Sequence, residues 1–148
     1  MRKKNKSERQ TESWFTAMGE EEGLPLVFRG RQSVPSGVDE SDYPSLVSIF
    51  WPYEPDNNGM PDAETNDAQI ELEDALEELD AAGVSLLMLV VTGNGRKEWH
   101  WYVCDVGSWM EELNRLLADH PVFPIEIENR HEPDWAMYHG FISGVDGI

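Results

Sequence analysis

The stretch from Val84 to Thr92 constrains the fold of this chain more than any other segment. Its residues are mostly apolar on both alternations of an extended strand, so both faces of that strand must be covered. We therefore expect it to be a central strand of a sheet. Apolar residues between Asp62 and Ala82 recur at three- and four-residue steps, which predicts an amphipathic helix before this strand. Gly83 is the expected end of that helix.

A hairpin is predicted immediately after the central strand. Gly93-Asn94-Gly95 contains an Asn-Gly pair that suits a tight turn, and Trp99 to Cys104 follows as the returning strand. Because side chains alternate along a strand, the returning strand presents two different faces. One face is expected to carry Trp99, Trp101 and Val103, and the other His100, Tyr102 and Cys104.

Four further strands and a second helix follow from the same periodicities. The strands are an opening hairpin of Trp14 to Met18 and Leu24 to Arg29, a strand over Pro44 to Trp51, and a last strand over Phe123 to Glu128. Ser108 and Glu111 form a capping box that predicts a helix ending at His120-Pro121. Asp134 to Tyr138 is expected to be a turn or a short terminal element.

The predicted elements occur in the order β-β-β-α-β-β-α-β. We therefore predict an α+β fold, a ferredoxin-like sandwich (β-α-β-β-α-β) with an additional N-terminal β-hairpin, in which an antiparallel sheet carries two helices on one face. Residues 1–12 are polar and mostly charged, which predicts a disordered basic tail. Residues 13–148 are predicted to form a single α+β domain.

The charge of the chain restricts the partners that it can have. The 148 residues include 29 acidic and 11 basic ones, a formal net charge of −18. Five of the basic residues lie in the first ten positions: Arg2, Lys3, Lys4, Lys6 and Arg9. The rest of the chain is therefore even more acidic, and we expect no direct binding of nucleic acid or anionic membrane. A protein partner with a basic surface is the expected ligand, although a simple solubility role fits the charge equally well.

Cysteine content and hydropathy predict a cytoplasmic location. Cys104 is the only cysteine, so no internal disulfide forms, and the chain opens without a charged-then-apolar leader. The longest purely apolar run, Leu86 to Val91, is far shorter than the roughly 20 residues that span a bilayer.

No catalytic, cofactor-binding or metal-binding residue is predicted, and no cofactor. Gly93-Asn94-Gly95-Arg96 lacks the further residues of a phosphate-binding loop. His100 and Cys104 would lie about 13 Å apart along a strand, too far for a nucleophile and its base. His100, His120, His131 and His139 have no metal-ligand spacing. A metal-dependent or hydrolytic enzyme that uses His100 or His131 remains an alternative.

A partner-binding surface is predicted from aromatic and acidic residues. The surplus of tryptophan is typical of interface anchors, and the acidic side of the helix before Gly83 would attract a basic partner. The candidate partner-binding residues are Trp101, Trp135, Tyr138, Glu73, Glu77 and Asp80. The alternative interpretation is that the tryptophans fill the core between sheet and helices and that the acidic residues are a solvated helix face.

The order of several short motifs resembles a bacterial domain of unknown function, family number six hundred ninety-five. The similarity runs from about Trp14 to Ile142 and includes Gly23-Leu24-Pro25-Leu26-Val27, Gly59-Met60-Pro61 and Thr92-Gly93-Asn94-Gly95-Arg96. The ending Asp134-Trp135-Ala136-Met137-Tyr138 also resembles that of the regulator of ribonuclease activity B family. Those small acidic proteins inhibit an endoribonuclease by binding it.

The function expected from these observations is that of a non-enzymatic protein-binding or regulatory module. Its partner would be a basic protein such as a nuclease. One alternative is an immunity protein that neutralises a basic toxin, and the other is the enzyme described above. The sequence indicates no oligomeric state.

Overall fold

A six-stranded antiparallel sheet forms the centre of the computed structural model, which describes residues 14–144. The strand order is β1-β2-β4-β5-β3-β6. The strands are β1 (Trp14–Glu21), β2 (Leu24–Arg31), β3 (Ser45–Pro52), β4 (Ser85–Gly93), β5 (Arg96–Val103) and β6 (Glu126–His131). The predicted α+β class and antiparallel sheet are confirmed. The predicted tail of residues 1–12 and the last four residues lie outside the described part of the chain.

Both predicted hairpins form. The turn between β1 and β2 consists of Glu22 and Gly23, whose φ angles are 54° and 81°. Positive φ at both central residues is the geometry of a type I′ turn, which matches the twist of paired strands. Asn94 and Gly95 adopt the same conformation between β4 and β5, with φ angles of 52° and 82°. The first turn fixes the register of the whole β1–β2 pair, and the second fixes that of β4–β5 from Gly93 to Leu89, where a β-bulge shifts it.

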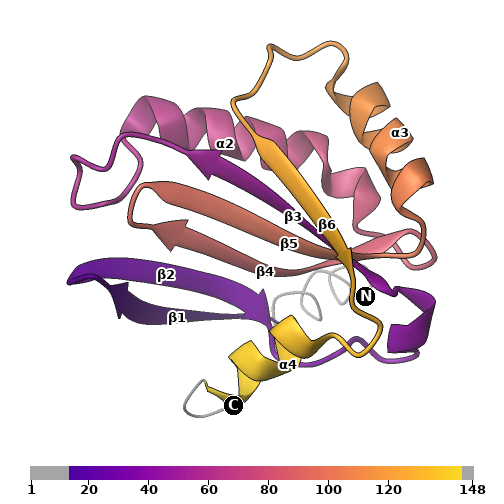
Figure 1. Cartoon of the computed structure of the whole chain (residues 1–148). Helices are drawn as coiled ribbons and strands as arrows, with labels where there is room; N and C mark the ends of the chain where they lie inside the picture. Colours follow the sequence, from indigo (N-terminus) through magenta and orange to yellow (C-terminus); the bar gives the residue numbers. More distant parts are fainter. Residues whose placement is uncertain (1–13, 145–148) are drawn as a thin grey trace, which may run out of the picture.

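One face of the sheet is covered by two helices, α2 (Ala63–Ala75) and α3 (Val106–Leu117) (Figure 1). Leu72 of α2 and Trp109 and Leu113 of α3 pack against the sheet in one apolar cluster. The sheet contributes one alternating set of side chains to it: Val47, Ile49, Trp51, Leu87, Val90, Trp99, Trp101 and Val103. The prediction that Trp99, Trp101 and Val103 share one face of β5 is therefore confirmed. In the described part of the chain, no helix has the length and hydropathy to cross a membrane.

The other face of the sheet is covered at one end by α4 (Ala136–Ser143) and the 3₁₀ turn η1 (Glu40–Asp42). Trp135 is 0% exposed, and its ring stacks on Tyr102 at 4.2 Å between centroids. Its indole Nε1 donates a hydrogen bond of 3.0 Å to the carbonyl oxygen of Tyr43. The segment predicted as a turn or short element is thus a helix whose first residues anchor a second apolar cluster.

The helix predicted to reach Ala82 ends earlier. α2 ends at Ala75, and a 3₁₀ turn, η2 (Glu77–Leu79), follows. The chain leaves the α-helical path because Asp80 turns toward the sheet, where its carboxylate accepts a hydrogen bond from the Leu87 N–H. The Ser85 hydroxyl donates a hydrogen bond to the carbonyl oxygen of Leu79. This bond replaces the N–H donor that a continued helix would have provided to that oxygen.

Two other predicted boundaries are also wrong. The N-cap of α3 is Asp105, whose carboxylate accepts a hydrogen bond from the Ser108 N–H, so the helix starts before the predicted capping box. The last strand pairs from Glu126 to His131, because Pro124 has no N–H to donate to a neighbouring strand. Phe123 and Ile125 nevertheless pack against the core.

Replacing Trp135 by Ala should lower the free energy of unfolding by about 3–5 kcal/mol, because a fully buried indole is lost and a cavity remains. Urea unfolding followed by far-UV circular dichroism measures the change. The matched control is Val122→Ala at a side chain that is 99% exposed, where a change within about 0.5 kcal/mol is expected. Equal effects of the two substitutions would contradict the assignment of α4 to the core.

Candidate functional site

A pocket of about 480 Å³ lies where β1 and β2 extend the sheet beyond the cover of α2. Four of the six predicted partner-binding residues line it: Glu73, Glu77, Asp80 and Trp101. Glu73 belongs to α2, Glu77 to η2 and Trp101 to β5, and Asp80 directly follows η2, so the fold brings together residues from a helix, a turn and a strand. We refer to this site as the acidic pocket.

Two arginines of β2 face Trp14 of β1 in this pocket. The guanidinium carbons of Arg29 and Arg31 lie 5.6 Å and 5.1 Å from the centroid of the Trp14 ring. Alternation explains their position, because Arg29 and Arg31 are two residues apart on β2 and Trp14 pairs with Arg31. These cation–π contacts hold both guanidinium groups over an aromatic surface beside the acidic helix.

Arg29 joins the sheet to α2. Its Nη2 lies 2.9 Å from Oε1 and 2.8 Å from Oε2 of Glu73. Trp99 Nε1 donates a further hydrogen bond of 3.0 Å to Glu73 Oε1. The Glu73 carboxylate is thus compensated by the Arg29 guanidinium, the Trp99 N–H and the charge of the nearby Lys97.

Arg31 makes a more buried connection to the end of the helical segment. Its Nε donates to the carbonyl oxygen of Leu87 at 3.0 Å, and its Nη2 lies 3.1 Å from Asp80 Oδ2. Burial raises the pKa of Asp80 above its ordinary value, while the charge of Arg31 and the Leu87 N–H act in the opposite direction. Asp80 therefore depends on Arg31 to remain ionised at low energetic cost.

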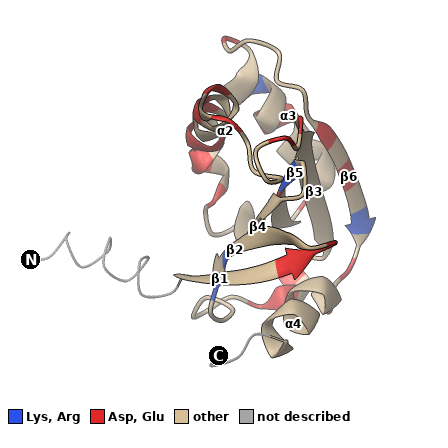
Figure 2. Cartoon of the chain, turned by 90° about the vertical axis from the view of Figure 1, so that its left-hand side faces the viewer, with Lys and Arg blue, Asp and Glu red and all other residues tan. Residues whose placement is uncertain are grey.

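Two acidic residues of the pocket have no such compensation. Within residues 14–144, neither Asp74 nor Glu77 forms an ion pair, and both side chains are exposed. The outer side of α2 and η2 continues the negative charge (Figure 2). Its exposed acidic residues are Asp62, Glu64, Asp67, Glu71, Asp74, Glu77 and Glu78, which we call the acidic surface. The sequence has no Lys, Arg or His between Arg31 and Arg96, so few cations offset it.

The aromatic predictions need correction. Trp101 lines the acidic pocket but is only 2% exposed, and its Nε1 has no hydrogen-bond partner among the described residues. Trp135 and Tyr138 are 0% and 1% exposed and lie in the cluster on the other face of the sheet. All three rings are core residues in this conformation and do not form an exposed anchor.

Four aromatic or charged residues that line the pocket were not predicted from the sequence: Trp14, Arg29, Arg31 and Asp74. Strand alternation could have placed both arginines on one side of β2, the side that also carries Trp14 of the paired strand. Glu73 and Asp80 are distant from β2 in sequence, so the acidic neighbours of the two arginines could be identified only from the tertiary structure.

Histidine and cysteine residues form no metal site in the described part of the chain, where no group of three or more His, Cys, Asp or Glu has a suitable arrangement. His131 is exposed at the end of β6. Cys104 is partly buried, and burial together with the charge of Asp42 raises the pKa of its thiol, which disfavours the reactive thiolate.

Comparison with known families matches residues 12–143 to a family of unknown function, DUF695. The chain belongs to this family. The match covers all described strands and the whole of α4, so the DUF695 domain includes the acidic pocket. No curated protein matches the chain.

Replacing Arg31 by Met should destabilise the DUF695 domain by about 1–3 kcal/mol at pH 7, because the partly buried Asp80 then lacks its cation. Without Arg31 the pKa of Asp80 rises further, so the folded state binds a proton more readily than the unfolded state. The loss should therefore be largest at pH 7 and shrink as the pH falls toward 4. Urea unfolding at several pH values measures this trend.

The double variant Arg31→Met/Asp80→Asn is the control for this prediction. It lacks the charge of Asp80, so the pH dependence of the destabilisation should disappear. A destabilisation by Arg31→Met that is equal at pH 7 and pH 4 would show that the Arg31–Asp80 pair is not the cause.

Proposed function

We propose that this DUF695 domain is a regulatory binding module that recognises a basic surface on a protein partner. The observation that carries this proposal is the pairing state of the acidic pocket. Arg29 and Arg31 compensate Glu73 and Asp80, whereas Asp74 and Glu77 at the same site have no ion-pair partner among the described residues. Binding of this kind needs no covalent step by the domain.

The pocket suits an arginine or lysine side chain of the partner. Such a side chain has an apolar stem that can pack on Trp14, while its cationic group meets Asp74 and Glu77. Two arginines of the domain already occupy similar positions against the Trp14 ring. The acidic surface around the pocket would accelerate the encounter with a basic protein through its long-range field.

A nuclease is the partner class that fits best. Enzymes that bind a nucleic acid carry basic clefts for its phosphates, and an acidic protein can occupy such a cleft in place of the substrate. The resemblance of Asp134 to Tyr138 to the regulator of ribonuclease activity B family favours an endoribonuclease. A toxin nuclease neutralised by this domain is the second form of the same proposal, and a neighbouring toxin gene would favour it.

We also propose that β3, α2, β4, β5, α3 and β6 form a ferredoxin-like unit that acts in the cytoplasm. The observed strand order β4-β5-β3-β6 and the packing of α2 and α3 on one face support this classification. The β1–β2 hairpin then extends the sheet next to β4 and supplies Trp14, Arg29 and Arg31. In this view the added hairpin creates the binding pocket.

The double variant Asp74→Asn/Glu77→Gln should lower the affinity for a short arginine-rich peptide by about tenfold at about 50 mM salt, since one to two charge pairs are lost. The amide side chains keep the size of the carboxylates. Fluorescence anisotropy of the labelled peptide gives the dissociation constant.

The matched control is Glu20→Gln/Glu126→Gln, which removes the same charge from exposed positions outside the acidic pocket. We expect less than about a twofold effect from this control at the same salt concentration. Equal losses for the two double variants would mean that the peptide responds only to net charge, which contradicts a specific pocket. Inhibition of a candidate nuclease that survives Asp74→Asn/Glu77→Gln unchanged would also contradict the proposal.

A further inference from the structure

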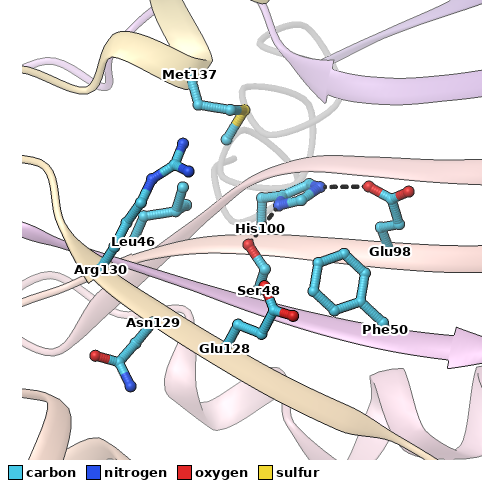
Figure 3. A pocket seen from close by; sticks show the side chains of 9 residues that line it. All are labelled: Leu46, Ser48, Phe50, Glu98, His100, Glu128, Asn129, Arg130 and Met137. Atoms are coloured by element: carbon cyan, nitrogen blue, oxygen red, sulfur yellow. Dashed lines mark hydrogen bonds and ion pairs between the residues drawn. The ribbon is translucent and has the colours of Figure 1, made fainter.

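A second pocket, of about 200 Å³, lies on the face of the sheet opposite to α2 and α3 (Figure 3). Ser48 of β3 and Glu98 and His100 of β5 line it together with Phe50, Arg130 and Met137. α4, which contains Met137, covers only one end of this face, so the pocket remains open beside it. We call it the serine pocket.

A chain of hydrogen bonds connects three of these side chains. Ser48 Oγ lies 2.8 Å from Nδ1 of His100, and Nε2 of His100 lies 2.9 Å from Oε1 of Glu98. Arg96 holds the other carboxylate oxygen, since its Nε and Nη2 lie 3.0 Å and 2.7 Å from Glu98 Oε2. Arg96 and His100 therefore each hold one oxygen of the Glu98 carboxylate. Figure 3 draws the two hydrogen bonds of the His100 imidazole, to Glu98 and to Ser48.

The direction of these hydrogen bonds follows from the ionisation of Glu98. Burial raises the pKa of this carboxyl group, but the hydrogen bonds and charges of His100 and Arg96 outweigh burial, and the pKa is lowered overall. A carboxylate only accepts hydrogen bonds, so Nε2 of His100 carries the proton that faces Glu98. In the neutral imidazole Nδ1 is then an acceptor, and the Ser48 hydroxyl donates to it. This is the polarity of a nucleophile and its general base.

The sheet holds these groups rigidly. Ser48 is directly opposite His100, and Phe50 is directly opposite Glu98, in the β3–β5 register. β3 is also paired with β6 on its other side, where Ser48 is opposite Glu128. The side chains of Ser48 and Glu98 therefore cannot move apart without breaking strand pairing, which is a form of preorganisation.

We propose that Ser48 is the nucleophile of an acyl-transfer site that hydrolyses esters with small acyl groups. Ser48 Oγ forms a bond to the carbonyl carbon of the ester while its proton passes to His100 Nδ1. The tetrahedral intermediate expels the alcohol, which takes the proton from His100, and the acyl group stays on Ser48. Water then attacks the acyl-serine with His100 as base, which releases the acid and restores the hydroxyl.

The walls of the serine pocket indicate the class of substrate. Leu46, Phe50 and Met137 provide an apolar surface whose size suits a short acyl chain. Arg130 is the cation of the pocket, and its Nε and Nη2 bind Glu132 Oε2 at 3.0 Å and 2.9 Å. Since β3 is paired with a strand on each side, its backbone has little capacity to bind a developing oxyanion. The proposal assigns that role to Arg130, the one Lys or Arg among the described residues that line the pocket.

This activity goes beyond the proposed binding function and does not depend on it. The serine pocket and the acidic pocket lie on opposite faces of the sheet and share no lining residue. Loss of peptide binding in an acidic-pocket variant would leave the reactivity of Ser48 intact, and the reverse also holds.

The test is covalent labelling of the full chain by a fluorophosphonate probe, which reacts with activated serine hydroxyls. The proposal predicts one added label in the intact mass and assigns it to Ser48 by peptide fragmentation. This readout needs no variant, so a folding defect cannot obscure it. No label on the native chain, or a label on a different serine, overturns the proposal.

Two substitutions give a matched comparison on the same strand. Ser48→Ala should abolish labelling, whereas Ser45→Ala, whose side chain belongs to the opposite face of β3, should label at the rate of the unchanged chain. Thermal unfolding by circular dichroism verifies that both variants fold. Equal labelling of Ser48→Ala and Ser45→Ala contradicts the proposal.

Glu98 acts through His100 and is a positioning residue. Glu98→Gln should slow labelling by at least about tenfold, because the imidazole loses the carboxylate that orients it and stabilises its protonated form. For the same reason the pH of half-maximal labelling should move lower. A labelling rate and pH profile unchanged by Glu98→Gln would contradict the hydrogen-bonded chain as the source of the reactivity.

Discussion

The pairing register of β3 with β5 is the constraint on which the rest of the structure depends. It places Val47 opposite Trp101 and Ile49 opposite Trp99, so that one alternating set of side chains builds the core beneath α2 and α3. The same register places Ser48 opposite His100 on the other face. A slip by one residue would exchange the two faces and bury polar groups under the helices.

The two faces differ because they are covered to different extents. α2 and α3 cover the centre of one face, and the β1–β2 hairpin continues past them to form the acidic pocket. On the other face, Trp135 and Tyr138 attach α4 over one end of the sheet and leave the serine pocket open. The family match spans both sites, although the family itself has no known function. Incomplete coverage of a fully formed sheet thus provides both candidate sites.

Local patterns in the sequence were sufficient for much of the fold. The alternation in β5 predicts correctly which side chains share a face of the sheet, and the Asn-Gly turn predicts the hairpin. The start of α3 was predicted wrongly because Asp105, and not Ser108, caps the helix. The start of β6 was predicted wrongly because Pro124 has no N–H to donate, so pairing begins at Glu126. Contacts between residues distant in sequence could not be predicted. Arg31 and Asp80 are 49 residues apart, and Ser48 and His100 are 52 apart, so only tertiary structure brings each pair together.

The role of tryptophan shows the same limit. A surplus of Trp fits both an interface and a core, and burial alone decides that Trp101 and Trp135 belong to the core.

The β3–β5 register is tested most directly by cross-strand nuclear Overhauser effects in solution. The account predicts contacts that pair Ser48 with His100 and Ile49 with Trp99. A set of contacts that pairs Ser48 with Trp99 or Trp101 would contradict it.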